Sequence, residues 1–219
     1  MKPILLINFK TYKSGTGESA LKLAKICNDI SRKKNVRIMI AVQTADIFAI
    51  ARKVNIPVLA QHVDYFEQDR HTGAIIPEDV KEEGAFGTLI NHSEHRLRFN
   101  ILKRTVVRCK EVDLKTIVCA ASISEVKKIV KLKPYMIMFE DPKLVSTGKS
   151  ITKIEPKSVK EFVNIVNKTK SGAIPLCGAG ISTKEDVKLA LELGCKGVGV
   201  ASAILKSRNH YRKILELIE

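Results

Sequence analysis

Eight short apolar runs, separated by segments with helical periodicity, constrain the fold of this chain more than any other feature. The runs are rich in Val and Ile, which is typical of parallel strands that are buried on both faces. Strands that alternate with helices form a parallel sheet with right-handed crossovers, either doubly wound or closed into a barrel. The runs are Ile4–Ile7, Val36–Val42, Val58–Ala60, Gly87–Ile90, Thr116–Cys119, Tyr135–Phe139, Ile174–Cys177 and Gly197–Val200.

Eight strand candidates favour the closed (β/α)8 barrel over the doubly wound sheet. The chain has 219 residues, near the low end for such a barrel, so we expect a compact version with some shortened helices. No linker or low-complexity segment interrupts it, and residues 1–219 are interpreted as a single domain. The connection from His95 to Asp113 is basic and weakly periodic, which predicts a reduced or irregular crossover there.

Helix starts are marked by local signals between the strands. Pro77, followed by two acids, suits a first helical turn, because proline lacks only a donor that is unpaired there. Ser122 with Glu125 and Ser182 with Glu185 have capping-box spacing. Further helices are predicted over Glu18–Ile30, from Glu155-Pro156 to Val166, and over Arg208–Ile218.

Composition narrows the function classes. The net charge is +15, but the lysines are spread over most helices and no patch is interleaved with aromatic residues. This pattern favours a solvated surface, with steering of anionic substrates as an addition, over a nucleic-acid-binding protein. The five cysteines form no CxxC pair, which argues for free thiols in a reducing compartment and against a zinc site.

The N-terminal apolar run and the other runs are too short for targeting or membrane insertion. Ile4–Ile7 provides four apolar residues before Asn8, fewer than a signal-peptide core needs. No run approaches the roughly 20 residues of a membrane helix. We therefore expect a soluble cytoplasmic protein without a membrane partner.

The stretch Met136–Lys149 carries a carboxylate directly after a predicted strand. Glu140 would lie at the carboxyl end of that strand, where parallel barrels present their active-site groups. Pro142 stiffens one end of the following loop, and Gly148 allows unusual dihedral angles at the other. The loop is either an ordinary surface connection or a lid that closes over a site.

Two other strand ends carry groups that could act on a substrate. Lys10 follows the first strand and can place a positive charge at the site, with Asn8 beside it. His92 follows the fourth strand and is an acid–base or electrophile candidate. A helix that began at Ser93 would face His92 with its N-terminus and keep the imidazole neutral, and Glu94 could pair with Lys10.

Small residues follow the last two strands. The segments Cys177–Thr183 and Gly199–Ala203 both precede predicted helices. Small residues let backbone N–H groups approach an anion, and the loops after strands seven and eight form the phosphate site of many barrels. Both loops are therefore candidates for phosphate binding, although tight turns alone also require glycine.

This ordered set of motifs resembles the triosephosphate isomerase family, in its short archaeal branch. The resemblance spans almost the whole chain and rests on Asn8-Phe9-Lys10, Ala60-Gln61 with Thr72-Gly73 and Pro77, His92-Ser93-Glu94, Glu140 with Pro142 to Gly148, and the two small-residue loops. It implies a compact TIM barrel. It also implies interconversion of dihydroxyacetone phosphate and D-glyceraldehyde 3-phosphate through an enediolate, in glycolysis and gluconeogenesis, without a metal or organic cofactor.

The resemblance also implies a role for individual residues. Glu140 matches the base that moves a proton between two carbons, and His92 the neutral electrophile. Lys10 matches the cation of the site and Asn8 its neighbour. Substrate phosphate would be held by the backbone of Val145 in the lid and of Gly180, Ala201 and Ser202.

Assembly follows from the same resemblance. In the family, the loop that matches Gln61–Ala74 docks beside the neighbouring subunit's site, so a homodimer is the minimum and the short branch suggests a homotetramer.

Three departures from the family pattern stand out: Phe9 where Trp is common, Asn91 where Gly often precedes the histidine, and His95 where Arg is common. The alternative is another phosphate-binding barrel enzyme, of cofactor or amino-acid biosynthesis.

Overall fold

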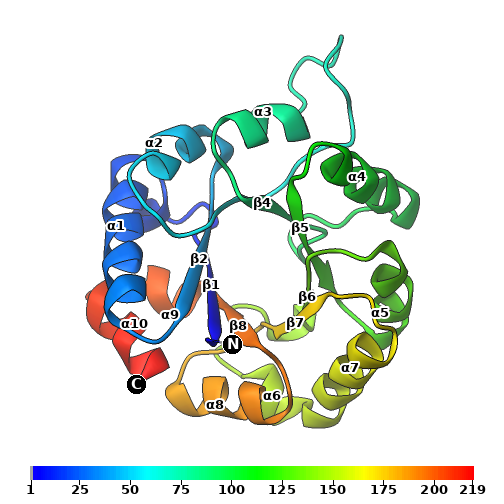
Figure 1. Ribbon diagram of the computed structural model, residues 1–219. Coiled ribbons are helices and arrows are strands. Elements are labelled where there is room, and N and C mark those ends of the chain that lie inside the picture. Colours follow the sequence, from blue (N-terminus) through cyan, green and yellow to red (C-terminus); the bar gives the residue numbers. More distant parts are fainter. Residues whose placement is uncertain (1) are drawn as a thin grey trace.

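The computed structural model describes residues 2–219, and Met1, the first residue of the predicted domain, lies outside the described residues. Eight parallel strands close into a barrel in chain order, with β8 beside β1 (Figure 1). This confirms the predicted (β/α)8 barrel, and every strand begins and ends within one residue of its predicted bounds. The strands are β1 Ile4–Asn8, β2 Arg37–Val42, β3 Val58–Ala60, β4 Gly87–Ile90, β5 Lys115–Ala120, β6 Met136–Phe139, β7 Ile174–Cys177 and β8 Gly197–Val200.

Side chains along each strand alternate between the barrel interior and the surrounding helices, because successive residues point to opposite faces. In β6, Met136 and Met138 belong to the buried cluster inside the barrel. Ile137 and Phe139 belong to the cluster between barrel and helices. The alternation therefore turns the next residue, Glu140, inward at the carboxyl end of the strand.

A ring of helices covers the barrel (Figure 1). α2 has five residues, α3 six and α6 four, so the predicted shortening of some helices is confirmed. Within residues 2–219 no helix has both the length and the apolar character that crossing a membrane requires. The helices are α1 Gly17–Lys33, α2 Ile47–Ala51, α3 Pro77–Glu82, α4 Phe99–Glu111, α5 Ile123–Ile129, α6 Ile151–Ile154, α7 Pro156–Lys168, α8 Lys184–Glu192, α9 Ser202–Leu205 and α10 His210–Ile218; short 3-10 turns are η1 Lys13–Gly15, η2 Thr44–Asp46, η3 Val130–Leu132 and η4 Pro142–Leu144.

The crossover between β4 and β5 differs from the expectation. It was predicted to be reduced or irregular, but α4 is a regular helix of 13 residues. Leu102, Val106 and Cys109 are buried on one face of it, at the spacing of successive helical turns. Burial of this apolar stripe stabilises the helix, although the exposed lysines and arginines obscure its periodicity in the sequence. The prediction of an irregular crossover was therefore wrong.

The capping box of α8 lies one residue further along than predicted. Ser182 and Glu185 have the right spacing, but the N-cap is Thr183 and its partner is Asp186. The Asp186 carboxylate accepts from the backbone N–H groups of both Ser182 and Thr183, at 3.0 Å each. The Asp186 carboxylate thus accepts hydrogen bonds from two backbone N–H groups at the helix start, which is why it, rather than Glu185, completes the capping box.

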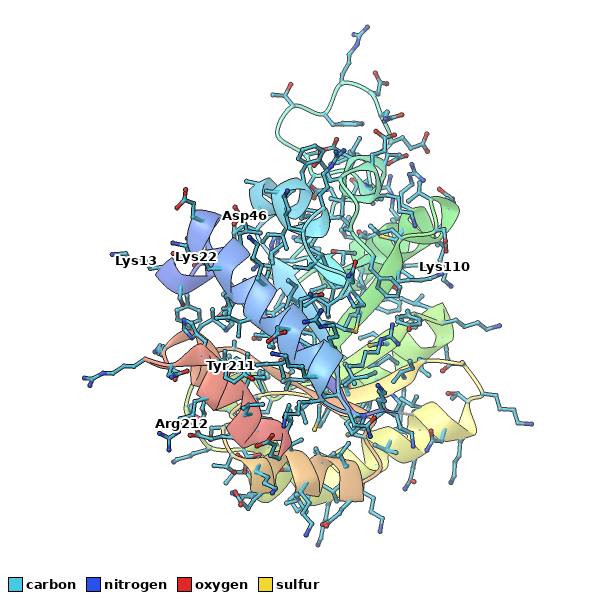
Figure 2. The ribbon with its side chains drawn as sticks, turned by 60° about the vertical axis from the view of Figure 1, so that its left-hand side comes forward. Lys13, Lys22, Asp46, Lys110, Tyr211 and Arg212 are labelled. Carbon is cyan, nitrogen blue, oxygen red and sulfur yellow. The ribbon has the colours of Figure 1, made fainter. Side chains whose placement is uncertain are left out.

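The segment between β3 and α3 extends away from the ring of helices in both views (Figures 1 and 2). Asp64 and Ile75 close its base, because each donates a backbone N–H to the other residue, at 2.7 and 2.9 Å. Residues 67–73 at its tip are exposed.

Elsewhere on the surface, Lys13 and Arg212 extend outward from the ribbon (Figure 2), as expected for a lysine- and arginine-rich solvated face.

Candidate active site

A cavity of about 330 Å³ lies at the carboxyl ends of the strands. Its lining includes residues that follow β1, β4, β6, β7 and β8, so the closure of the barrel brings together segments far apart in the chain. All eight candidate site residues lie in this lining: Asn8, Lys10, His92, Glu140, Val145, Gly180, Ala201 and Ser202.

Glu140 is a nearly buried carboxylate, 7% exposed. Its Oε2 atom lies 3.8 Å from Nε2 of His92 and has no hydrogen-bond partner among residues 2–219. Gly178 makes room for it, since a Cβ atom there would lie only 2.5 Å from Oε1. An unpartnered carboxylate oxygen in a cavity is free to accept a proton from a molecule that enters it.

Cys119 lies inside the barrel beside Glu140. Burial raises the pKa of the Cys119 thiol well above its ordinary value, and the charge and hydrogen bonding of Glu140 add to the rise. The thiol is therefore protonated, and it supplies no competing negative charge or nucleophile next to the carboxylate. The other cysteines are also buried and unpaired, in agreement with the expectation of free thiols.

His92 is buried and held by the backbone that follows it. The N–H of Glu94 donates to Nδ1 of His92 at 3.2 Å. A ring nitrogen that accepts a hydrogen bond carries no proton, so this contact assigns a neutral imidazole with its proton on Nε2, the atom that faces Glu140. No helix begins at Ser93; residues 93–94 form a turn. One N–H of this turn, rather than a helix terminus, accounts for the neutral ring.

The residue before the histidine explains one departure from the family pattern. Asn91 has a φ of 64°, in the left-handed region that glycine and, among other residues, asparagine adopt most readily. Both ends of its side-chain amide are hydrogen-bonded: the nitrogen donates to the Cys119 carbonyl at 2.9 Å, and the oxygen accepts from the Leu97 N–H at 3.0 Å. Asparagine thus meets the conformational requirement that glycine often meets there and also ties β4 to β5.

Lys10 occupies a strained backbone position that several side chains stabilise. Its φ is 48°, and its backbone N–H donates to Oδ1 of Asn8 at 2.9 Å. Its carbonyl accepts from the amides of Gln43 and Gln61, at 3.1 and 3.0 Å. The ammonium group lies 2.7 Å from Oε1 of Glu94, which is the predicted pairing.

Three backbone N–H groups of residues that line the cavity have no partner in the described part of the chain. Those of Gly180, Ala201 and Ser202 donate to no acceptor within residues 2–219. Gly180 has a φ of 70°, and a Cβ atom there would lie 1.9 Å from the carbonyl oxygen of Lys149, so only glycine fits. Free donors that line a cavity are suited to bind the oxygens of an anion.

The segment after β6 borders the same cavity. Pro142–Leu144 forms a 3-10 turn whose start is capped by the Asp141 carboxylate. Leu144 is buried, whereas Ser146 to Lys149 are exposed. Val145 contributes to the cavity lining, so this segment borders the site.

Sequence reasoning missed some residues that shape the site. Gln43 directly follows β2, so the rule that active-site groups follow strand ends would have found it. Cys119 lies within a strand and gives no signal of its own. Lys206 also lines the cavity, but it lies beyond the small-residue loop, after α9. Within residues 2–219 no three side chains of His, Cys, Asp or Glu are grouped so as to hold a metal ion.

Barrels of this architecture carry their active sites at the carboxyl ends of the strands. Here the facing carboxylate and neutral imidazole lie at that end and line the same cavity as the unpaired backbone donors. The fold and its cavity thus define a (β/α)8-barrel enzyme.

Comparison with known proteins gives the family. The family model described as Triosephosphate isomerase matches residues 3–218. Triosephosphate isomerases of Methanobacterium bryantii, Methanocaldococcus jannaschii and Methanothermus fervidus are 42%, 41% and 40% identical to this chain. Each alignment covers 99% of this chain and 96%, 99% and 98% of the respective relative. The chain therefore belongs to the triosephosphate isomerase family, and the predicted family, enzyme class and activity are confirmed.

Proposed function

We propose that this chain interconverts dihydroxyacetone phosphate and D-glyceraldehyde 3-phosphate with Glu140 as the base, His92 as the electrophile and Lys10 as an electrostatic stabiliser. The observation that carries the proposal is the 3.8 Å approach of the free Glu140 Oε2 to Nε2 of His92. A substrate in the cavity that lies against both groups has a C–H bond facing a carboxylate and a carbonyl oxygen facing an N–H donor.

Glu140 takes the proton from one carbon of the substrate and returns it to the neighbouring carbon. The two substrate oxygens exchange carbonyl and hydroxyl character through a planar enediolate. One proton moves from the first carbon through Glu140 to the second, and one proton moves between the two oxygens, so the atoms and charges balance without another reactant. The carboxylate is suited to this role because it is nearly buried and no protein donor occupies Oε2.

His92 donates from Nε2 to the oxygen that becomes negative. A neutral imidazole can give and regain this proton, and the N–H of Glu94 holds the ring in the required tautomer. The Lys10 ammonium adds positive charge where the oxyanion develops, and preorganised charges of this kind stabilise transition states strongly. Asn8, Gln43 and Gln61 keep the Lys10 backbone in place.

The substrate phosphate binds to the free N–H groups of Gly180, Ala201 and Ser202, with the backbone of Val145 closing over it. Residues Lys143–Ser146 form the moving part of a lid, between a stiff end at Pro142 and a second hinge at Thr147–Lys149. Exclusion of water by the lid protects the enediolate from loss of phosphate. The left-handed residues Ser146 and Gly148, with φ of 61° and 75°, support a segment that can rearrange.

We further propose that residues 1–219 form one domain and that the chain assembles as a cytoplasmic homo-oligomer. The assembly is at minimum a dimer, and the resemblance to the short archaeal branch favours a tetramer. The projecting segment between β3 and α3 supports the dimer, because its tip is exposed and extends away from its own barrel. Phe99 and Val107 on α4 are exposed apolar residues that a larger assembly would cover. Sedimentation at assay concentration tests this, and an active monomer would contradict it.

The experiment that tests the catalytic assignment is Glu140→Asp in an isomerase assay coupled to a dehydrogenase. The shorter side chain withdraws the carboxylate by about 1 Å, and a misplacement of that size can cost about 10²-fold in rate. We expect kcat to fall by at least about 10²-fold with little change in inhibitor binding. Turnover near that of the wild type would eliminate Glu140 as the base.

A further inference from the structure

We infer that Lys206 is a second substrate-binding cation, whose ammonium group attracts and binds the substrate phosphate from the side of α9. This inference rests on the proposed function and extends it to a residue outside the motifs described above. Lys206 lines the same cavity as Gly180, Ala201 and Ser202, so this residue borders the cavity that holds the free backbone donors.

The backbone of Lys206 is fixed at the cavity edge. Its N–H donates to the Ser202 carbonyl at 3.1 Å at the end of the short helix α9. The preceding carbonyl, of Leu205, accepts from the Ser14 hydroxyl at 2.6 Å, which ties this position to the segment after β1. Because the backbone is held in place, only the rotamers of the exposed Lys206 side chain have to become ordered when a ligand binds.

Within residues 2–219 no strong partner competes for the ammonium group of Lys206. It forms no ion pair within the described part of the chain, whereas Lys10 is paired with Glu94 at 2.7 Å. Among residues 2–219 it makes one cation–π contact, with Tyr12, whose ring centroid lies 5.8 Å from Nζ, near the outer limit of such a contact. The charge is thus available to a ligand at the cost of one weak contact.

The charges around the cavity show why a second cation would favour phosphate binding. The charged side chains in the lining are Lys10, Glu140 and Lys206, and Glu94 neutralises Lys10. Without Lys206, the positive Lys10 and the negative Glu94 and Glu140 leave one net negative charge, which repels a phosphate dianion. Lys206 cancels this charge and does so on the side where the phosphate has to bind.

Three variants of one position test the inference. Lys206→Met removes the charge and keeps a long apolar stem, Lys206→Arg keeps the charge, and Lys206→Glu reverses it. The matched control is Lys168→Met, which removes an exposed lysine at the C-terminal end of α7. Because the helices run antiparallel to the strands, that end lies away from the cavity.

We expect Lys206→Met to raise KM for D-glyceraldehyde 3-phosphate and Ki for inorganic phosphate by about threefold to tenfold at low salt. The effect of the substitution on kcat should be small. Lys206→Glu should have the larger effect, and Lys206→Arg should restore binding. The difference from the wild type should shrink between about 0.01 and 0.15 M salt, as screening increases. The rate with unphosphorylated D-glyceraldehyde should not change.

Equal KM and Ki values for Lys206→Met and Lys168→Met would overturn the inference, as would a fall in kcat at constant KM. A wild-type protein without isomerase activity would refute the proposed function instead. A wild-type protein that is active and insensitive to Lys206→Glu would refute only the role of Lys206. The two failures are therefore distinguishable in one set of assays.

Discussion

Substitution of Gly178 tests the position of the proposed base without changing any reacting group. Gly178 follows β7, and a Cβ atom there would lie 2.5 Å from Oε1, 3.1 Å from Cγ and 3.2 Å from Cδ of Glu140. Ordinary van der Waals contact begins at 3.4 Å. In Gly178→Ala the carboxylate therefore has to move by about 0.9 Å, the difference between 3.4 and 2.5 Å.

A displacement of this size predicts a large loss of rate and little loss of stability. A shift of ~1 Å in a catalytic group can cost about 10²-fold, which corresponds to roughly 2.7 kcal/mol of activation free energy. Gly178 does not have a positive φ, so alanine adds no backbone strain. Alanine also reduces the entropy of the unfolded chain by about 0.4–1 kcal/mol, which offsets part of the cost of moving Glu140.

The assay is steady-state isomerase turnover, combined with urea unfolding of the same protein. Gly17→Ala is the control, because Gly17 has a positive φ and no atoms near its Cβ position; it should lose some stability and keep kcat. In the Glu140→Asp background the added methyl group should cost less than about threefold, since the shorter side chain withdraws from it. Wild-type kcat in Gly178→Ala, or full additivity with Glu140→Asp, would refute the reasoning.

Two further predictions concern stability. Burial lowers the pKa of His62 below its ordinary value of 6.5, the nearby His95 lowers it further, and Asp64 opposes both. The folded state therefore excludes a proton that the unfolded chain binds as the pH falls through 6.5, so stability should decrease there. His62→Asn should flatten this decrease in thermal unfolding scans between pH 7.5 and 5.5, and an unchanged slope would contradict it. Thr183→Ala should cost about 1 kcal/mol in urea unfolding, because it removes the capping hydroxyl of α8, whereas Thr183→Ser should cost little.

The strands and the inward direction of Glu140 were predictable because they depend on local patterns. A parallel strand buried on both faces reads as a continuous apolar run, and β6 shows the alternation that turns Glu140 inward after Met136 and Met138. The same rule places Asn8 after Ile4 and Leu6. These inferences need only the side-chain period of a strand and the position of its carboxyl end.

The environment of His92 was less predictable because it depends on one hydrogen bond in an irregular turn. Ser93 and Glu94 are compatible with a helix start, yet the chain turns back and the N–H of Glu94 caps Nδ1 of the histidine instead. The contacts of Gln43 with Lys10, and of Lys206 with the cavity, join loops from different strands. No spacing along the chain encodes such contacts, since the closure of the barrel creates them.

The end of the proposed lid and the loop after β7 form one structural unit, which limits how the lid can move. The N–H of Ile151 donates to the Ala179 carbonyl at 3.1 Å, and Gly180 packs against the Lys149 carbonyl. Asp186 at the start of α8 is paired with the Lys153 ammonium at 2.7 Å. Burial alone would raise the pKa of Asp186, but Lys153 and the N–H groups at the start of α8 lower it. These contacts fix the chain from Lys149 onward, so closure of the lid has to be accommodated before Lys149, where Ser146 and Gly148 hold left-handed dihedral angles.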